Sequence, residues 1–119
     1  MESILKTKSY QFAIRIVKLC QFLVKEKKET VLSKQILRSG TSIGALIREA
    51  EYGQSKADFV SKMSIALKEA NETEYWLSLL NDTGYITNEQ FTSINKDMTE
   101  VKKLLVSTVK TSKQNLSKQ

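Results

Sequence analysis

Apolar residues recur along this chain at alternating intervals of four and three, which is the spacing of one face of an α-helix. In the first stretch, for example, the series runs Phe12, Ile16, Leu19, Leu23. Three further stretches show the same spacing, and none shows the strict alternation of a strand. The predicted helices span about 8–27, 33–52, 56–83 and 88–112, followed by a polar tail at 113–119 that we expect to be frayed.

Residues that start or end helices lie between these stretches. Thr87 and Gln90 form a capping-box pattern ahead of the fourth stretch. Gly53 and Gly84 stand where a left-handed residue would end the second and third stretches. Because the connections are only about three to five residues long, neighbouring helices must run antiparallel. The sequence therefore predicts an all-α, up-down-up-down four-helix bundle that forms a single domain over residues 1–119.

The composition is close to that of an ordinary soluble globular protein, and the cysteine content fits a reducing cytoplasm. Of the 119 residues, 40% are hydrophobic and 27% are charged, which is typical of a globular domain. No apolar run approaches the roughly 18 residues that a membrane span requires. The single cysteine, Cys20, excludes an intrachain disulfide and lies among apolar residues. We therefore expect a cytoplasmic protein without a membrane segment.

The formal net charge is +6, and most of the excess lies in the first and last helical stretches. A basic surface can bind a polyanion such as RNA or DNA, but lysines can equally serve only to solvate a surface. If the first and fourth helices are neighbours, their basic strips merge into one surface. The nucleic-acid-binding candidates are Arg15, Lys18, Lys25, Arg38, Lys102, Lys103 and Lys110.

The residues offer little catalytic chemistry. The chain has no histidine, so it lacks the commonest general base and the usual nitrogen ligand of zinc. Glu69 and Glu72 are one helical turn apart, which leaves a carboxylate-only magnesium site or a paired-carboxylate acid/base formally open. Ion pairing with lysine or arginine on an adjacent helix or subunit explains them more simply. We expect a non-enzymatic protein with no catalytic, cofactor or metal site.

Two features of the second and third helices suggest close packing. Gly40 and Gly44 lie one turn apart inside a helix, where glycine costs up to about 1 kcal/mol relative to alanine. We therefore expect a tight helix crossing there, either within the bundle or between subunits. Trp76 in the third helix either packs in the core or in an interface, or it stacks on a nucleic-acid base.

The segment from Ile36 to Ala50, ILRSGTSIGALIREA, resembles the R-S-x-x-S-I-x-x-N-I-x-E-G core of a four-helix-bundle family. That family is encoded in intervening sequences of bacterial 23S ribosomal RNA genes and is often labelled S23 ribosomal protein. The run from Ala66 to Leu77, ALKEANETEYWL, is similar to the family's third helix. Leu46 and Ala50 depart from the family's usual Asn and Gly. The matching positions are Arg38, Ser39, Ser42, Ile43 and Glu49.

This resemblance implies a small, non-enzymatic bundle that assembles into a ring-like homopentamer. A related branch is the accessory protein of diversity-generating retroelements, a basic pentamer that works with a reverse transcriptase and nucleic acid. Two functions follow as expectations. The first is binding of RNA or DNA through the basic surface. The second is a protein-interaction scaffold or an accessory subunit for a reverse transcriptase.

Overall fold

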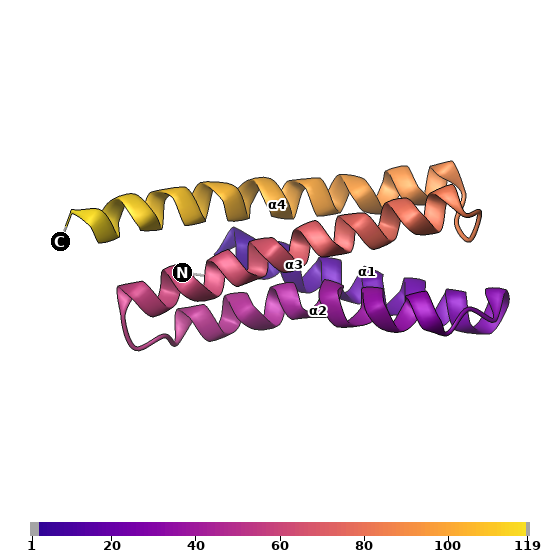
Figure 1. Cartoon of the computed structure of the whole chain (residues 1–119), viewed down its shortest axis with the longest axis horizontal. Coiled ribbons are helices and arrows are strands. Elements are labelled where there is room, and N and C mark those ends of the chain that lie inside the picture. Colours follow the sequence, from indigo (N-terminus) through magenta and orange to yellow (C-terminus); the bar gives the residue numbers. More distant parts are fainter. Residues whose placement is uncertain (1–2, 119) are drawn as a thin grey trace.

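The computed structural model describes residues 3–118 and confirms the predicted four-helix bundle. Figure 1 shows four long helices lying side by side, with α3 in front, α2 and α4 on either side of it, and α1 behind. Their bounds are α1 Ile4–Lys27, α2 Val31–Glu51, α3 Lys56–Asp82 and α4 Asn88–Ser117.

Consecutive helices pack against each other, and α4 also packs against α1, which closes the bundle. The resulting rod measures 51 × 24 × 21 Å. The helices α1 and α4 pack together least extensively of the four neighbouring pairs, so the seam between them is the most open. Within residues 3–118, no helix is both long and apolar enough to cross a membrane.

The helix α1 begins four residues before the predicted start because Ser3 caps it. The Ser3 hydroxyl accepts a hydrogen bond from the backbone N–H of Lys6, at 3.4 Å. The helix ends at Lys27, and the next residue, Lys28, caps it with a left-handed backbone (φ of 55°) and an N–H that donates to the carbonyl of Leu23. A left-handed lysine carries no signal in the sequence, unlike a glycine at the same position.

The helix α2 also begins earlier than predicted, at Val31, because Glu29 caps its first turn. The Glu29 carboxylate accepts hydrogen bonds from three backbone N–H groups, those of Val31, Leu32 and Ser33, at 3.1, 2.9 and 2.8 Å. These are among the donors that a helix start leaves without partners inside the helix. Although glutamate is not a usual capping residue, Glu29 is only 8% exposed, and both of its carboxylate oxygens accept hydrogen bonds.

The turn glycines behave differently from each other. Gly84 has φ of +82°, as predicted, and it follows the end of α3. The prediction for Gly53 was wrong, because its φ is not positive. A Cβ at Gly53 would instead lie 2.6 Å from a carboxylate oxygen of Asp58 and 3.1 Å from the carbonyl of Ala50, so a larger residue would require the Asp58 side chain to move.

The capping box predicted for α4 is confirmed, with hydrogen bonds between Thr87 and Gln90 in both directions at 2.8 and 3.1 Å. The far end differs from the prediction, because α4 continues through residues 113–117 to Ser117. This segment contains neither glycine nor proline to stop it. Gln119, the last residue of the predicted tail, lies outside the described residues.

The core is built from the apolar stripes seen in the sequence. Burial of each large aliphatic or aromatic side chain is worth about 1.5–3 kcal/mol, which makes this core the main source of stability. Its largest fully buried side chains are Phe12, Ile16 and Leu23 from α1, Ile36, Ile43 and Ile47 from α2, Leu77 and Leu80 from α3, and Met98, Val101 and Leu105 from α4.

The expected tight crossing lies within the bundle, between α1 and α2. A Cβ at Gly40 would meet two carbons of the Ile16 side chain at 2.8 and 2.9 Å, so the two helices approach too closely for any larger residue. Gly44 has more room, since its Cβ would lie 3.5 Å from the carbonyl and hydroxyl oxygens of Ser9.

Candidate nucleic-acid interface

Arg15, the first of the predicted basic residues, holds α1 against α4. Its guanidinium pairs with Asp97 at 2.7 Å and donates to the carbonyl and hydroxyl oxygens of Ser93 at 3.0 and 2.9 Å. About two turns earlier in α1, Lys8 pairs with Glu100 at 2.6 Å. These contacts make α1 and α4 neighbours, as the merging of their basic strips requires. They also neutralise the charge of Arg15, because Asp97 is its ion-pair partner.

Lys102 is directed toward α3 instead of the α1–α4 seam. Its ammonium lies 2.7 Å from the Glu74 carboxylate, and both side chains are about one-third exposed. The neighbouring residue, Lys103, is exposed and has no ion-pair partner in the described part of the chain. Consecutive helical residues point about 100° apart, which explains why two adjacent lysines have such different surroundings.

Arg38 lies on the opposite side of the molecule, across the α2–α3 interface. It pairs with Glu69 at 3.2 Å and also with Glu72, so the predicted ion pairing of these two glutamates occurs within the chain. The Trp76 indole N–H donates to Glu72 at 3.0 Å, and the Tyr75 ring packs edge-on against Trp76 at 5.0 Å. This cluster therefore binds α2 to α3.

The same cluster changes two protonation equilibria. The indole N–H of Trp76, followed by the hydrogen bond and charge of Arg38, lowers the pKa of Glu72 below its ordinary value. In return, hydrogen bonding to Glu72 raises the pKa of Arg38. Both groups are held in their charged forms, which suits an ion pair and not a proton-transfer pair.

The other four candidates remain exposed on α1 and α4 without an ion-pair partner among residues 3–118. Lys18 and Lys25 are seven residues apart on α1 and so share a face. On α4, Lys103 and Lys110 are likewise seven residues apart. Lys96, which was not among the predicted candidates, extends this row because it precedes Lys103 by seven residues and is also exposed. We define the basic face as Lys18 and Lys25 of α1 together with Lys96, Lys103 and Lys110 of α4.

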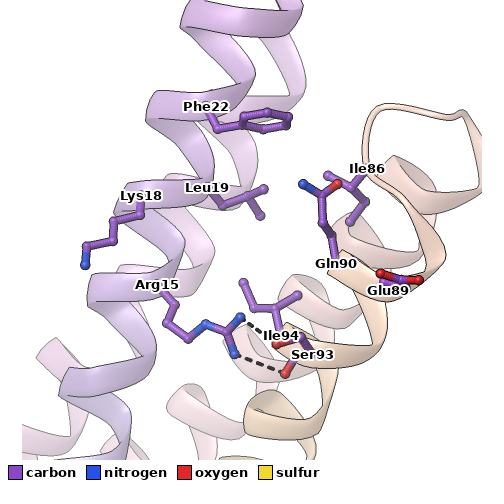
Figure 2. A pocket seen from close by; sticks show the side chains of 9 residues that line it. All are labelled: Arg15, Lys18, Leu19, Phe22, Ile86, Glu89, Gln90, Ser93 and Ile94. Carbon is purple, nitrogen blue, oxygen red and sulfur yellow. Dashed lines mark hydrogen bonds between the residues drawn. The ribbon is translucent and has the colours of Figure 1, made fainter.

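A groove of about 550 Å³ opens between α1 and α4, beside the loop that joins α3 to α4. Figure 2 shows Leu19 projecting toward Ile94 and Gln90 across it, with Arg15 bridging the helices at one end. Lys18 stands at the rim with its ammonium pointing away from the groove. The groove is lined by Leu19, Phe22, Ile86 and Ile94 on its apolar side and by Arg15, Lys18, Glu89, Gln90 and Ser93 on its polar side.

The groove combines an apolar floor with charges of both signs at its edges. Lys27 places its ammonium 5.9 Å from the centre of the Phe22 ring, and Glu89 lines the α4 side. Such a surface can accept an apolar group that carries a polar edge.

The family-motif positions of α2 serve packing more than recognition. Ser39, Gly40 and Ile43 are buried, while Ser42 and Gly44 are half-buried. Ser39 is hydrogen-bonded to Thr73 of α3 at 2.9 Å. Glu49 is exposed and lies 3.4 Å from Lys62 of α3.

Cys20 is equally structural. Its thiol donates to the carbonyl of Ser33 at 3.4 Å, and burial, assisted by the charge of Glu29, raises its pKa to about 11. A thiol held protonated in this way is a poor nucleophile. Across residues 3–118, no three acidic or cysteine side chains are grouped closely enough to hold a metal ion.

The family model of the 23S rRNA-intervening sequence protein matches residues 1–107. The chain belongs to this family. The resemblance seen in the segment from Ile36 to Ala50 is therefore confirmed. No curated protein matches the chain.

Among solved structures, the chain is similar to a Bacteroides thetaiotaomicron protein of the S23 ribosomal protein family, whose crystal structure at 1.70 Å resolution describes a protein with unknown function. The two are 67% identical, the match covers 90% of this chain and 99% of the other, and the TM-score is 0.89. This likeness agrees with the four-helix fold and with the family assignment.

Proposed function

We propose that this protein is a non-enzymatic, cytoplasmic, ring-like homopentamer that binds RNA or DNA through the basic face. The observation that carries this proposal is the pair of lysine rows on adjacent helices, Lys18 and Lys25 on α1 and Lys96, Lys103 and Lys110 on α4. These lysines are exposed, while the more buried basic residues of the same helices are already paired.

The charge balance of this surface favours a polyanion. Asp97 and Glu100, which lie between the two rows, are neutralised by Arg15 and Lys8. Glu89 is the one acid at the groove for which the described residues provide no ion-pair partner. The lysine rows thus face solvent with little opposing charge.

The mechanism is phosphate neutralisation with little reading of base identity. Each phosphate that a lysine neutralises releases a counterion, so affinity falls as salt rises. Lysine is a flexible point charge, and contacts of this kind position a nucleic acid without specifying its sequence. A ring multiplies the weak contacts of one subunit, because subunits bound to the same nucleic acid act at high effective concentration.

The decisive experiment is fluorescence anisotropy with labelled RNA and DNA at several salt concentrations. With about four phosphates neutralised, affinity should fall about 100-fold between about 50 and 200 mM salt. Absence of binding at about 50 mM salt, or binding that does not respond to salt, would contradict the proposal.

The assembly is tested separately by light scattering. A ring predicts a mass several times the 13.5 kDa of one chain. A monomer at micromolar concentration would remove the contribution of multivalency. The absence of enzymatic activity also has a test, since turnover that disappears in both Glu69→Ala and Glu72→Ala would contradict it.

A second candidate function is a protein-interaction scaffold, such as an accessory subunit for a reverse transcriptase. The apolar floor of the groove between α1 and α4 favours it, because nucleic-acid phosphates do not need such a floor. Co-purification with a reverse transcriptase that survives nuclease treatment and is lost in Leu19→Glu would support this function. Loss of the partner on nuclease treatment alone would count against it.

A further inference from the structure

The two lysine rows of the basic face lie on either side of the groove between α1 and α4. On α1, Lys18 lines the groove, and Lys25 follows it on the same helix face. On α4, Glu89 lines the groove, and Lys96 shares its helix face because it follows by seven residues. A nucleic acid whose phosphates contact both rows therefore passes over the mouth of the groove.

The groove itself is unsuited to a phosphate. Of the two basic residues that line it, Arg15 is paired with Asp97, and Lys18 directs its ammonium away from the groove (Figure 2). Glu89 at the α4 edge repels an anion, and a charge buried without a partner costs free energy. An uncharged group fits better against the floor, which consists of the half-buried Leu19 and Phe22 and the buried Ile86 and Ile94.

Gln90 adds a hydrogen-bond donor whose direction is fixed by the α4 capping box. Its side-chain oxygen accepts a hydrogen bond from the backbone N–H of Thr87, at 2.8 Å. The amide nitrogen of the same planar group must then point the other way, and Figure 2 shows it on the side of Leu19, facing across the groove. The donor is thus oriented before any ligand binds, which lowers the cost of binding.

Phe22 supplies a ring on which a flat group can stack. Among the described residues that line the groove, it alone is aromatic, and it is half-buried, so part of the ring remains accessible. The ammonium of Lys27 lies 5.9 Å from the ring centre. Proteins hold unpaired bases mainly by stacking them on such rings, and every base has a face that can stack. A cation beside the ring can reach the phosphate next to a stacked base.

We propose that the groove binds one unpaired base of a single-stranded nucleic acid, or of a loop or bulge, whose phosphates lie along the basic face. This rests on the proposed nucleic-acid binding and adds the part of the ligand that the apolar floor accepts. The base stacks on Phe22, and an acceptor on its edge receives a hydrogen bond from the Gln90 amide. Every base carries such an acceptor, so the groove selects unpaired bases without distinguishing one from another.

This arrangement predicts a preference that the lysines alone would not produce. A surface that only neutralises phosphates should bind a duplex at least as tightly as a single strand, because the duplex has the higher charge density. In a duplex, however, each base is paired and stacked, and its extrusion costs free energy. The groove therefore favours single strands.

The sharpest test compares two single strands that carry the same phosphates. One is an oligothymidylate, and the other has the same length but abasic sites throughout. By fluorescence anisotropy at one low salt concentration, the wild type should bind the oligothymidylate about tenfold more tightly, as expected for one stacked base. The comparison needs no variant, so it does not depend on the folding of a mutant.

Two variants assign this preference to the groove. Phe22→Leu keeps the floor apolar but removes the ring, and it should reduce the preference for the oligothymidylate about fivefold. Gln90→Glu keeps an acceptor for the Thr87 N–H, because glutamate also forms a capping box, but it removes the donor. It should also reduce the preference. Circular dichroism would verify that both variants fold.

Each variant has a matched control outside the groove. Phe91→Leu removes another half-buried ring, on α4, and should leave the preference unchanged. Gln21→Glu adds the same charge as Gln90→Glu at an exposed position of α1. It should weaken the binding of both strands equally, since it acts on the phosphates and not on a base.

The outcomes separate this inference from the proposed function. Equal and salt-dependent binding of the two strands by the wild type would overturn the base site and leave the proposed function standing. No binding of either strand at about 50 mM salt would overturn both. A preference that persists in Phe22→Leu and in Gln90→Glu would place the base elsewhere and overturn the inference. So would groove variants that lose only a co-purifying protein, because a protein would then be the occupant.

Discussion

The hydroxyl of Thr73 is hydrogen-bonded to the hydroxyl of Ser39 across the α2–α3 interface, at 2.9 Å, and neither residue is exposed to solvent. Thr73 also lies 2.8 Å from the carbonyl of Glu69. Ser39 has one other acceptor nearby, the Ile36 carbonyl at 3.5 Å. Within the described residues, every buried polar side-chain atom has a partner, so this pair is a fully satisfied polar contact in an apolar core.

Thr73→Val should therefore destabilise the fold by about 1–3 kcal/mol, because it leaves the Ser39 hydroxyl buried without a good partner. Urea unfolding at a fixed protein concentration measures the effect. The double variant Ser39→Ala with Thr73→Val should recover part of the loss, since both polar groups are then gone. Additive losses in the double variant would show that the hydrogen bond does not couple the two sites.

Gly40→Ala should lower stability, because its Cβ would lie within 3.0 Å of two carbons of the fully buried Ile16. Overpacking of this kind costs about 1–3 kcal/mol, against a gain of about 1 kcal/mol in helix propensity. Gly44→Ala is the matched control, since its Cβ makes ordinary contacts at 3.5 Å. It should be neutral or slightly stabilising in the same denaturation experiment, and equal losses at both sites would contradict the assigned crossing.

Glu29→Ala should destabilise α2 by about 0.5–2 kcal/mol, because three backbone N–H groups at its start lose their acceptor. Glu26, three residues earlier, is exposed and makes no capping hydrogen bond. Glu26→Ala should therefore have little effect. Amide hydrogen exchange at Val31, Leu32 and Ser33 should accelerate in the first variant and stay unchanged in the second.

Lys103→Ala and Lys102→Ala should differ in nucleic-acid binding although the residues are adjacent. Removal of the exposed Lys103 ammonium should weaken binding to all sequences and reduce the salt slope by about 1 for each phosphate that is no longer neutralised. Lys102 is paired with Glu74, so its replacement should leave the salt slope unchanged and cost at most about 1 kcal/mol of stability. Equal effects on anisotropy would place the binding surface elsewhere.

Trp76→Phe should raise the pKa of Glu72, because the indole N–H is the largest factor that lowers it. A carboxyl whose pKa is lowered by folding stabilises the fold above its unfolded pKa, and this stabilisation is lost as pH falls through the lowered folded value. Acid should therefore unfold Trp76→Phe at a higher pH than the wild type. Carboxyl NMR titration would measure the shift directly, and an unchanged Glu72 in the variant would contradict the assigned cause.

The helices could be predicted from the sequence because burial of one face imposes the helical period on residues such as Phe12 and Ile16. Helix starts that rely on common signals, such as Thr87 with Gln90, were equally visible. The start of α2 was not, because Glu29 is not a usual capping residue and its carboxylate reaches forward to backbone N–H groups two to four residues ahead.

The candidate surface could be predicted only in part, because helical spacing gives the face on which a residue lies but not its partner on another helix. Spacing assigns Lys18 and Lys25 to one face of α1, but it does not reveal which acid lies opposite each basic residue. The partners Asp97 of Arg15 and Glu74 of Lys102 come from other helices, at sequence separations of 82 and 28 residues. Only the folded chain separates the basic residues that hold the bundle together from those that face solvent.

The chain has one cysteine and one tryptophan, and they lie on different sides of α2. Cys20 sits beneath the first turn of α2 from α1, whereas Trp76 is bonded to the carboxylate that joins α3 to α2. Thiol labelling can therefore follow the separation of α1 from α2, and indole fluorescence can follow that of α3 from α2. The order in which the two halves of the bundle come apart can therefore be timed in the wild-type sequence, without an engineered cysteine or tryptophan.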